Sequence, residues 1–544
     1  MAFVSYQFIA FALGVLLLYY LLPRKAQWPL LLVASVCYFA FFGWEDLIFI
    51  AAATVISYVC ARIMAKISDS HHAFIEAHRD EYTKDERKEL KARTKKKRSR
   101  IMAAGLIIEF LMLGVTKYTA FAIENVNSVA SWFGSEGFKV PNLLEITGIS
   151  YFVFMTTAYL IDVNREKAAV ERNFFKYSLF VCFFPQLVQG PISRFGDLEA
   201  QLCTPHAPTY DNISAGLRRV LWGYFKKVIV ADRMLSAVKI IILGTTESAG
   251  AAYRGVYVVA VILFYTIQLY ADFTGGIDIT IGLARAMGIT LAENFRHPFF
   301  SKTTKEYWNR WHITMGTWFT DYIFYPMSVS KPMLKLSRWS REKLGTTIGK
   351  RVPVYFATIV TWFATGLWHG AAWNYIVWGL LNCLIILVAQ ELAPLFTKAA
   401  KKCPALFASK FHDYFMMFHT FWLMATVRIL DCYRNVGLTF RMWGSVFTTA
   451  NWGDLFNGAL LNLERVEDNV STYSTGAVYW ITILIGCVIM FAVSVIDVKK
   501  PIGERLKDKP CKTAVLCAVM LVCILIFGAY GSGYDASNFI YGQF

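Results

Sequence analysis

Long apolar runs divide this chain, and several approach the roughly 20 residues that a helix needs to cross the hydrocarbon core of a bilayer. Only 17% of the residues are charged, whereas about a quarter are charged in a typical soluble domain. The runs therefore predict an all-α, polytopic membrane bundle with about 11 spanning helices, located in the cell membrane (plasma or inner membrane). The clearest runs cover residues 3–22, 47–67, 102–123, 352–367, 371–389, 477–498 and 514–530.

The basic residues indicate how these spans are oriented. Arg24 and Lys25 follow the first run, and many later Lys and Arg crowd into loops such as residues 84–100. Short basic loops beside spanning helices normally lie in the cytoplasm. We therefore predict an outside N-terminus and a cytoplasmic charged segment over residues 68–100. Residues 292–351 are too polar to span and are predicted to lie on the cytoplasmic side as well.

The net charge of +17 belongs to the same pattern and does not indicate a nucleic-acid binder. The positive charges lie in loops beside apolar runs, where they act as topology signals and can contact anionic lipid headgroups. We expect membrane lipids, and no nucleic acid, among the partners. The chain is predicted to form one transmembrane domain over residues 1–530, followed by an extracytoplasmic tail over residues 531–544.

Cysteine spacing gives no sign of a structural cross-link or a metal centre. The 11 cysteines are scattered singly, many of them within apolar runs. No Cys-x-x-Cys pair or zinc-like spacing occurs, so no disulfide framework and no metal site are predicted. No bound cofactor is expected either.

The apolar residues 174–191 are interrupted by Pro185, Gly190 and Pro191, and they include Gln186. Proline and glycine break helices, and broken backbone at membrane depth persists only where it is buried in protein or lines a cavity. We therefore expect a re-entrant segment here.

Two of the nine histidines have unusual surroundings. His312 stands in a Trp-rich segment, and His369 stands where one apolar run gives way to the next. A histidine beside an apolar run is more often structural, and tryptophans favour the membrane interface. An ionisable group within a membrane is costly, however, and is a functional hypothesis by default. Gly366 and Gly370 flank His369 and would permit close approach of backbone or ligand.

Other polar side chains also occur in apolar settings. Buried polar groups need partners, so a structural network explains them as well as a substrate path does. Transporters and membrane enzymes both have polar interiors, and this pattern does not separate the two classes. The residues are Asp162, Gln268, Tyr270, Asp272, Asp278, Arg310 and Asp321.

Six motifs follow one another along the first 390 residues. They are Gly148-Ile-Ser-Tyr-Phe, Phe184-Pro-Gln-Leu-Val-Gln-Gly-Pro-Ile-Ser-Arg, Gln268-Leu-Tyr-Ala-Asp-Phe-Thr-Gly-Gly, Glu293-Asn-Phe, Tyr307-Trp-Asn-Arg-Trp-His-Ile-Thr and Gly366-Leu-Trp-His-Gly-Ala-Ala-Trp. Each motif is weak alone, but the ordered set closely resembles the membrane-bound O-acyltransferase family. The likeness is greatest to its bacterial branch, which includes alginate O-acetylation and teichoic-acid D-alanylation proteins. The resemblance thins beyond residue 390.

The resemblance implies roles for both histidines. His369 matches the catalytic histidine of the family, and His312 matches one towards the cytoplasmic side of a central tunnel, where a thioester donor enters. Re-entrant and horizontal helices are expected around that tunnel. Relatives of the alginate type often carry a further Trp-His-Gly in the next helix. This chain has Gly379-Leu-Leu-Asn-Cys there, which puts a third-histidine role in doubt. The residues expected to line the tunnel are Gln186, Asp272, Asn309, Arg310, Trp311, Asp321 and Trp368.

The C-terminal residues Asn538-Phe-Ile-Tyr-Gly-Gln-Phe resemble the FxYxxF end of the small peptide subunit of teichoic-acid D-alanylation systems. The resemblance implies that Tyr541, between Phe539 and Phe544, is a transient acyl carrier. The alternative is an aromatic tail that rests at the level of the lipid headgroups.

These features predict an O-acyltransferase that moves an acyl group, with acetyl favoured, from a cytoplasmic thioester across the membrane to a hydroxyl, ultimately on a cell-envelope or secreted polysaccharide. The donor would be acetyl-CoA or an acyl carrier protein thioester. His369 would remove the proton of the accepting hydroxyl, and His312 would help to hold the donor. An extracytoplasmic, SGNH-like transferase with a serine nucleophile would receive the group.

Two alternatives to this function stay open at the level of the sequence. One is transfer of D-alanyl or another acyl group from a carrier protein. The other is a non-enzymatic transporter or flippase, which predicts paired inverted repeats with interrupted helices in both halves.

Overall fold

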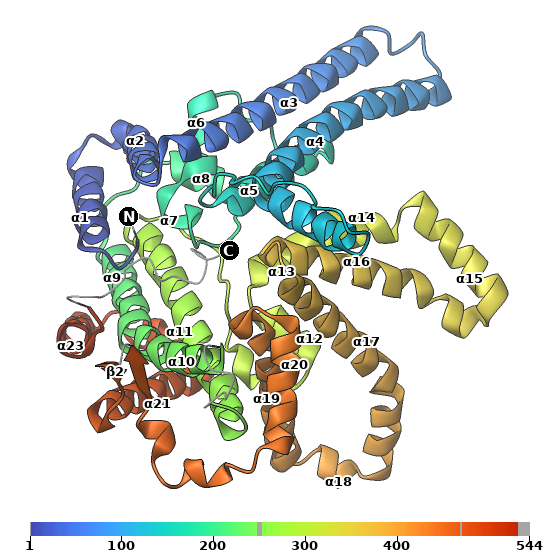
Figure 1. Ribbon diagram of the computed structural model, residues 1–544. Coiled ribbons are helices and arrows are strands. Elements are labelled where there is room, and N and C mark those ends of the chain that lie inside the picture. Colours follow the sequence, from blue (N-terminus) through green and yellow to red (C-terminus); the bar gives the residue numbers. More distant parts are fainter. Residues whose placement is uncertain (1, 247–252, 468–469, 531–544) are drawn as a thin grey trace. The chain divides into compact units, whose positions relative to one another are not determined.

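The computed structural model describes residues 2–246, 253–467 and 470–530, and helices account for most of them (Figure 1). The described chain forms two compact units. Unit 1 comprises Ser5–Ile213 and Leu283–Ala292, and unit 2 comprises Ala2–Val4, Ser214–Gly282 and Glu293–Phe544. The predicted all-α class is confirmed, apart from one short antiparallel hairpin of strands β1 (Glu464–Glu467) and β2 (Val470–Ser474) in the described part of the chain.

Unit 1 is built around helices that alternate with short connections. Its elements are α1 (Tyr6–Leu21), the 3-10 turn η1 (Arg24–Ala26), α2 (Gln27–Ala40), α3 (Trp44–Ala77), α4 (Lys84–Ser131), α5 (Ile149–Asn164), α6 (Phe174–Cys182), α7 (Phe184–Leu187) and α8 (Phe195–Cys203).

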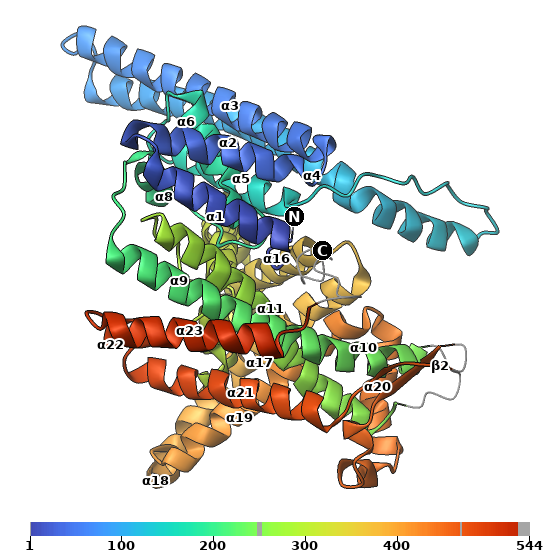
Figure 2. The ribbon, with the colours of Figure 1, turned by 90° about the vertical axis from the view of Figure 1, so that its left-hand side faces the viewer.

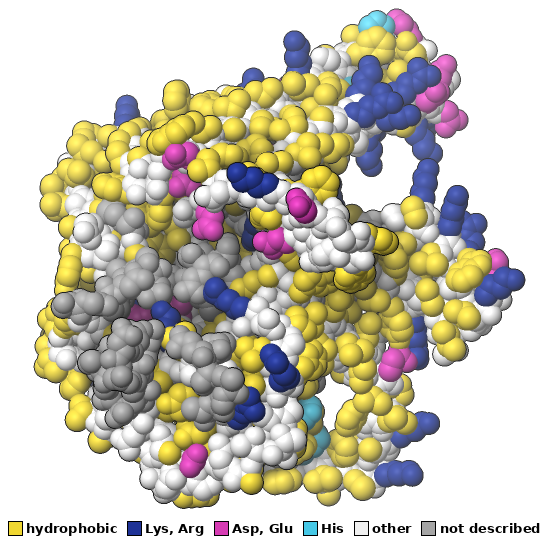
Figure 3. Space-filling view, in the orientation of Figure 1, with side chains coloured by type: hydrophobic (Ala, Val, Ile, Leu, Met, Phe, Trp, Pro, Cys, Tyr) yellow, Lys and Arg dark blue, Asp and Glu magenta, His cyan; other side chains and the backbone are white. Residues whose placement is uncertain are grey.

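Helix α4 has 48 residues, which corresponds to about 72 Å and exceeds the roughly 30 Å of a bilayer's hydrocarbon core. It begins at a capping box formed by Thr83 and Glu86. Its first residues are mostly charged, and Figure 3 shows Lys and Arg gathered at the end of α3 and α4 while hydrophobic side chains cover most of the rest of the pair. The charged segment 68–100 therefore forms the end of α3 and the start of α4, and the apolar portions of both helices lie beyond it.

Helix α5 forms the centre of unit 1, because most of its side chains are buried on every side. It packs against α3 and α4, and a Cβ on Gly105 of α4 would lie 2.9 Å from Leu160 Cδ1. The buried Glu109 carboxylate accepts a hydrogen bond from Thr156 Oγ1 at 2.9 Å. The contact at Gly105 lets α4 and α5 approach closely.

The segment 174–191 is not a continuous helix. The backbone breaks at Phe183, between α6 and α7, and both pieces are too short to cross a bilayer. Gln186 is buried; its side-chain oxygen accepts a hydrogen bond from Ser193, and its side-chain nitrogen donates one to the Phe180 carbonyl. The break matches the prediction from Pro185, while the re-entrant path stays a prediction.

Unit 2 holds the remaining elements. They are α9 (Tyr210–Tyr224, which begins in unit 1), the π-helix η2 (Phe225–Ala231), α10 (Asp232–Thr246), α11 (Val256–Ala286, which ends in unit 1), η3 (Pro298–Phe300), α12 (Thr304–Arg310), α13 (Ile313–Phe319), the π-helix η4 (Thr320–Phe324), α14 (Tyr325–Ser328), α15 (Lys331–Gly349), α16 (Val352–His369), α17 (Trp373–Lys402), α18 (Pro404–Phe407), α19 (Lys410–Tyr433), α20 (Val436–Thr448), η5 (Trp452–Leu455), η6 (Ala459–Leu461), the two strands, α21 (Ala477–Lys499), α22 (Ile502–Arg505) and α23 (Pro510–Phe527).

Six of the described helices are long and apolar enough to cross a membrane: α3, α4, α11, α17, α21 and α23. Helices α21 and α23, whose courses Figure 2 shows, both contact η2. They expose apolar side chains such as Leu484 and Ile526, as expected of surfaces that face lipid. Several other expected spans are shorter helices, such as α1 and α5. The multi-pass architecture is therefore supported, and the count of about 11 spans stays a prediction.

Candidate functional site

His312 occupies a sharp corner between α12 and α13 in unit 2. Its backbone is left-handed (φ 49°, ψ 52°), which is uncommon for a residue other than glycine. The corner is held by pairing with residues that precede α12: Arg296 N donates to Arg310 O, and Ile313 N donates to Asn294 O, both at 3.0 Å. A strained residue held by surrounding pairing is a common feature of functional sites.

Asn294 orients the His312 ring. Its side-chain oxygen accepts hydrogen bonds from Thr314 N and Thr314 Oγ1, both at 3.0 Å, and lies 3.3 Å from His312 Nδ1. Because this oxygen can only accept, His312 Nδ1 must carry the hydrogen, and the lone pair is assigned to Nε2. Burial, followed by the nearby charge of Arg428, lowers the pKa of His312 to about 3. His312 is therefore a neutral imidazole over the working pH range.

His369 is the last residue of α16 and is 8% exposed. Helices α16 and α17 pack together through glycines: a Cβ on Gly366 would lie 2.5 Å from the Tyr375 carbonyl oxygen, and one on Gly379 would lie 2.5 Å from the Trp362 carbonyl oxygen. Such contacts exclude any larger side chain and bring the two backbones close together. The glycines therefore fix the position of His369 against α17.

A tryptophan joins the two histidines. The Trp368 ring lies edge-on to both, with centroid distances of 6.0 Å to His312 and 5.0 Å to His369. On its other side, His369 packs edge-on against Trp378 at 4.8 Å. The structure thus brings the two predicted histidines into one aromatic cluster, although 57 positions separate them in the sequence numbering (369 − 312).

Arg428 of α19 is the main site residue that the sequence reasoning missed. Its guanidinium carbon lies 4.9 Å from the Trp311 ring centroid, 5.1 Å from Trp378 and 5.8 Å from Trp308. These are cation–π distances. A signal was available, because an arginine within the apolar run 411–429 is a functional hypothesis by default.

The other predicted tunnel residues are spread more widely. Asn309 is exposed, and Arg310 forms an ion pair at 2.6 Å with Glu306. Trp311 and Trp368 belong to the aromatic cluster, and Asp321 lies in the π-helix η4. Gln186 belongs to unit 1. That these residues line a tunnel stays a prediction.

Asp272 is paired with a buried lysine. Lys227 Nζ lies 2.7 Å from Asp272 Oδ1 and 2.8 Å from Asp232 Oδ1, and all three side chains are buried. A buried charge needs such partners to be tolerated. This geometry gives Asp272 a structural role whether or not it also faces substrate.

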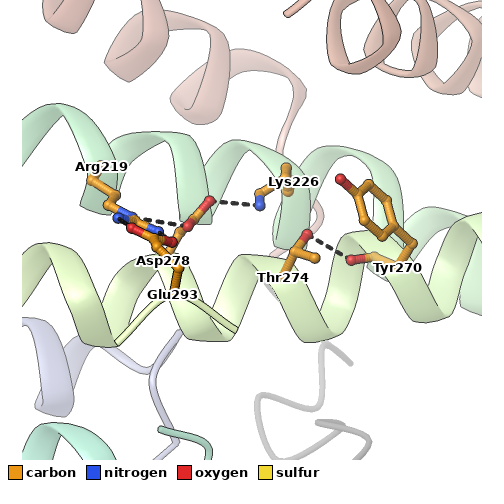
Figure 4. A network of polar contacts seen from close by, with 6 residues as sticks. All are labelled: Arg219, Lys226, Tyr270, Thr274, Asp278 and Glu293. Carbon is orange, nitrogen blue, oxygen red and sulfur yellow. Dashed lines mark hydrogen bonds and ion pairs between the residues drawn. The ribbon is translucent and has the colours of Figure 1, made fainter. Parts of the chain in front are cut away.

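A second ion network lies along α9, η2 and α11 (Figure 4). Asp278 accepts from Arg219 Nε at 3.0 Å and from Lys226 Nζ at 2.6 Å, and Glu293 also pairs with Arg219. The close packing of α9 and α11 depends on Gly223, where a Cβ would lie 2.6 Å from the Gly275 carbonyl oxygen. Through Arg219, the network therefore links Asp278, two residues beyond the Gln268 motif, to Glu293 of the next motif.

Tyr541, Phe539 and Phe544 lie outside the described residues. Within residues 2–246, 253–467 and 470–530, no three His, Cys, Asp or Glu side chains are grouped so that they could hold a metal ion.

Comparison with known proteins identifies the class of protein that carries this site. Residues 36–340 match the membrane-bound O-acyltransferase family, and the chain belongs to that family. It is therefore an O-acyltransferase and a multi-pass membrane protein, as the motifs predicted, and the transporter alternative loses its support.

Three similar proteins are named as acyltransferases of alginate, peptidoglycan and teichoic acid. A probable alginate O-acetylase, AlgI, of Azotobacter vinelandii is 30% identical over 85% of this chain and 81% of its own length. A peptidoglycan O-acetyltransferase of Helicobacter pylori is 29% identical over 52% of this chain and 54% of its own. A teichoic acid D-alanyltransferase of Bacillus subtilis is 27% identical over 45% of this chain and 59% of its own. The expected bacterial branch is confirmed.

Proposed function

We propose that this O-acyltransferase moves an acetyl group from a cytoplasmic thioester across the membrane to a hydroxyl, and ultimately to a cell-envelope or secreted polysaccharide. The observation that carries the proposal is the buried cluster in which Trp368 contacts both His312 and His369. Large aromatic rings surround both histidines, which favours a short acyl chain. The likeness to an alginate O-acetylase over most of both chains favours acetyl over D-alanyl.

In the proposed reaction, His369 removes the proton from the attacking hydroxyl. A hydroxyl is a poor nucleophile until a base takes its proton, and such catalysis contributes about 10²–10⁴-fold. His312 is neutral, and its Nε2 lone pair can accept a hydrogen bond, so it is assigned to holding the reactants with Asn309 and Arg310. Acetyl-CoA is the proposed donor, with an acyl carrier protein thioester as the alternative.

The route after transfer is also part of the proposal. Tyr541 in the tail is the proposed carrier of the acyl group on the extracytoplasmic side. An SGNH-like transferase with a serine nucleophile would take the group from Tyr541 to the polysaccharide. Dividing one difficult transfer into easier steps is the usual logic of covalent relays.

Membranes that contain the protein and receive radiolabelled acetyl-CoA test the reaction. We expect His369→Ala to lower the rate of label transfer by about 10²-fold or more. His419→Ala removes an exposed histidine on α19 and is the matched control, with wild-type activity expected. Equal incorporation by His369→Ala and wild type would refute the assignment of His369. Labelling from a D-alanyl carrier thioester but not from acetyl-CoA would favour the alternative donor.

A further inference from the structure

Arg428 is a buried cation whose hydrogen-bonding capacity is not used up. Its side chain is 6% exposed, and its Nη2 atom has no hydrogen-bond partner among residues 2–246, 253–467 and 470–530. A guanidinium stays charged and offers five N–H donors. A buried donor without an acceptor costs free energy, and the cost is larger for a charged group. The Nη2 atom can therefore donate to a further acceptor.

Other buried cations of unit 2 have carboxylate partners. Lys226 lies 2.6 Å from Asp278, and Lys227 lies within 2.8 Å of two carboxylates. Arg428 has no ion pair within 4.0 Å in the described part of unit 2. Its neighbours are the Tyr307 hydroxyl, to which it is hydrogen-bonded, and the Trp rings. The Asp431 carboxylate interacts with the Arg428 charge but does not form an ion pair with it within 4.0 Å. A residue kept only for stability would be expected to resemble the paired lysines.

Arg428 shares an aromatic neighbour with His369 and acts electrostatically on His312. Trp378 contacts the His369 ring at 4.8 Å on centroids and the Arg428 guanidinium at 5.1 Å. The charge of Arg428 is close enough to His312 to disfavour protonation of that ring. Asp431, one helical turn further along α19, accepts a hydrogen bond from Tyr265 at 3.0 Å and helps to hold this part of the helix. The guanidinium therefore faces the same cluster as both histidines.

We propose that Arg428 is a catalytic residue that donates a hydrogen bond from Nη2 to the carbonyl oxygen of the acyl group as that oxygen becomes negative. The inference rests on the proposed acyl transfer. Preorganised donors aimed at a developing oxyanion act strongly in a site that excludes water. The three Trp rings favour that exclusion and hold the guanidinium plane.

The acceptor hydroxyl oxygen forms a bond to the thioester carbonyl carbon while His369 takes the hydroxyl proton. The carbonyl π electrons move onto the oxygen, where Arg428 donates its hydrogen bond. The carbonyl then re-forms, the C–S bond breaks, and the leaving sulfur receives the proton from His369. The products are an ester and a free thiol, and Arg428 keeps its own protons throughout.

The test compares Arg428→Gln and Arg428→Lys with wild type in membranes supplied with labelled acetyl-CoA over a range of concentrations. We expect kcat to fall by about 10²–10³-fold in Arg428→Gln while KM for the donor changes less than about threefold. Arg428→Lys keeps the charge but loses the planar fork, and we expect a loss of at least about tenfold in kcat. Arg441→Gln, at an exposed position on α20, is the matched control and should match wild type.

Size-exclusion profiles and thermal melting of the detergent-solubilised variants check folding. If Arg428→Gln does not fold, the test rests on Arg428→Lys, for which the loss is again expected in kcat and not in KM for the donor. A kcat within about threefold of wild type in the folded variant would overturn the inference, as would a loss that appears wholly in KM. If wild type transfers neither acetyl nor D-alanyl, the proposed function itself fails. If His369→Ala is inactive while Arg428→Gln is active, only the role of Arg428 fails.

Discussion

The state of His312 is decided by its neighbours and not by its residue type. A histidine in water has a pKa near 6.5 and titrates in the physiological range. In this fold, burial and the charge of Arg428 lower the pKa of His312 to about 3, and Asn294 fixes the hydrogen on Nδ1. The same contacts therefore keep His312 neutral in the pH range in which a histidine in water would titrate.

The low pKa of His312 predicts a loss of stability in acid. Between pH 6.5 and pH 3 the unfolded chain binds a proton at His312 that the folded chain does not bind, so stability is full above pH 6.5 and falls as the pH decreases. Between pH 7 and pH 5 this loss is about 2 kcal/mol. We expect His312→Gln to lack that part of the acid sensitivity when unfolding is measured in detergent at both pH values. Identical pH dependence of wild type and His312→Gln would contradict the assigned pKa.

At the scale of elements, the site depends on how closely α16 and α17 approach each other. The turn between them carries His369 at its start, and Gly366 and Gly379 face the opposite backbone with no room for a Cβ. The packing places Trp378 of α17 against the His369 ring at a centroid distance of 4.8 Å. The Gly366-Leu-Trp-His-Gly-Ala-Ala-Trp segment, which resembles a family motif, therefore also packs α16 against α17.

Gly379→Ala tests this packing. The added Cβ would lie 2.5 Å from a backbone carbonyl oxygen of α16, which cannot rotate away, so the helices must separate. We expect a loss of about 1–3 kcal/mol in stability and a marked fall in acyl transfer. Gly114→Ala on α4 is the matched control, because nothing lies within 4 Å of the position of its Cβ. Thermal melting in detergent together with the label assay measures both effects; a wild-type result for Gly379→Ala would mean that the contact is not needed.

At the scale of the whole molecule, the two compact units divide the predicted site residues between them. The histidines, Arg428 and the tryptophans all belong to unit 2, whereas the broken segment with Gln186 belongs to unit 1. Six apolar helices are distributed over both units, and exposed apolar faces such as those of α21 and α23 favour contact with lipid. In the proposed function the acyl group crosses the membrane, and Tyr541 is the proposed acceptor on the far side.

Intact-mass analysis of the C-terminal peptide after exposure to the donor tests Tyr541. We expect an acetyl adduct on the wild-type peptide and none on Tyr541→Phe, because only the phenol hydroxyl can form the ester. Tyr530→Phe, at the end of the described chain, is the control and should retain the adduct. An adduct that persists in Tyr541→Phe would refute the carrier role while leaving acyl transfer at His369 unaffected.

The sequence alone determined that the chain folds in a membrane and that it belongs to the O-acyltransferases. It also singled out His312 and His369 as candidate site residues. Apolar runs of bilayer length are a local property, so the sequence anticipated α21 and α23 closely and the apolar parts of the longer helices α3, α4 and α17. The ordered motifs led to the correct family. Motifs that lie along one segment, such as those around His312 and His369, are readable without knowledge of the fold.

Only the tertiary structure decided which groups meet. Trp368 lies between the two histidines, Arg428 joins them from a helix about 60 positions further on (428 − 369 = 59), and Asp272 turns out to neutralise Lys227. These pairings depend on the close approach of helices through glycines and on the burial that makes an unpaired charge costly. Neither is a property of one segment, because a side chain acquires its partner, its pKa and its chemical role only when distant segments pack against it.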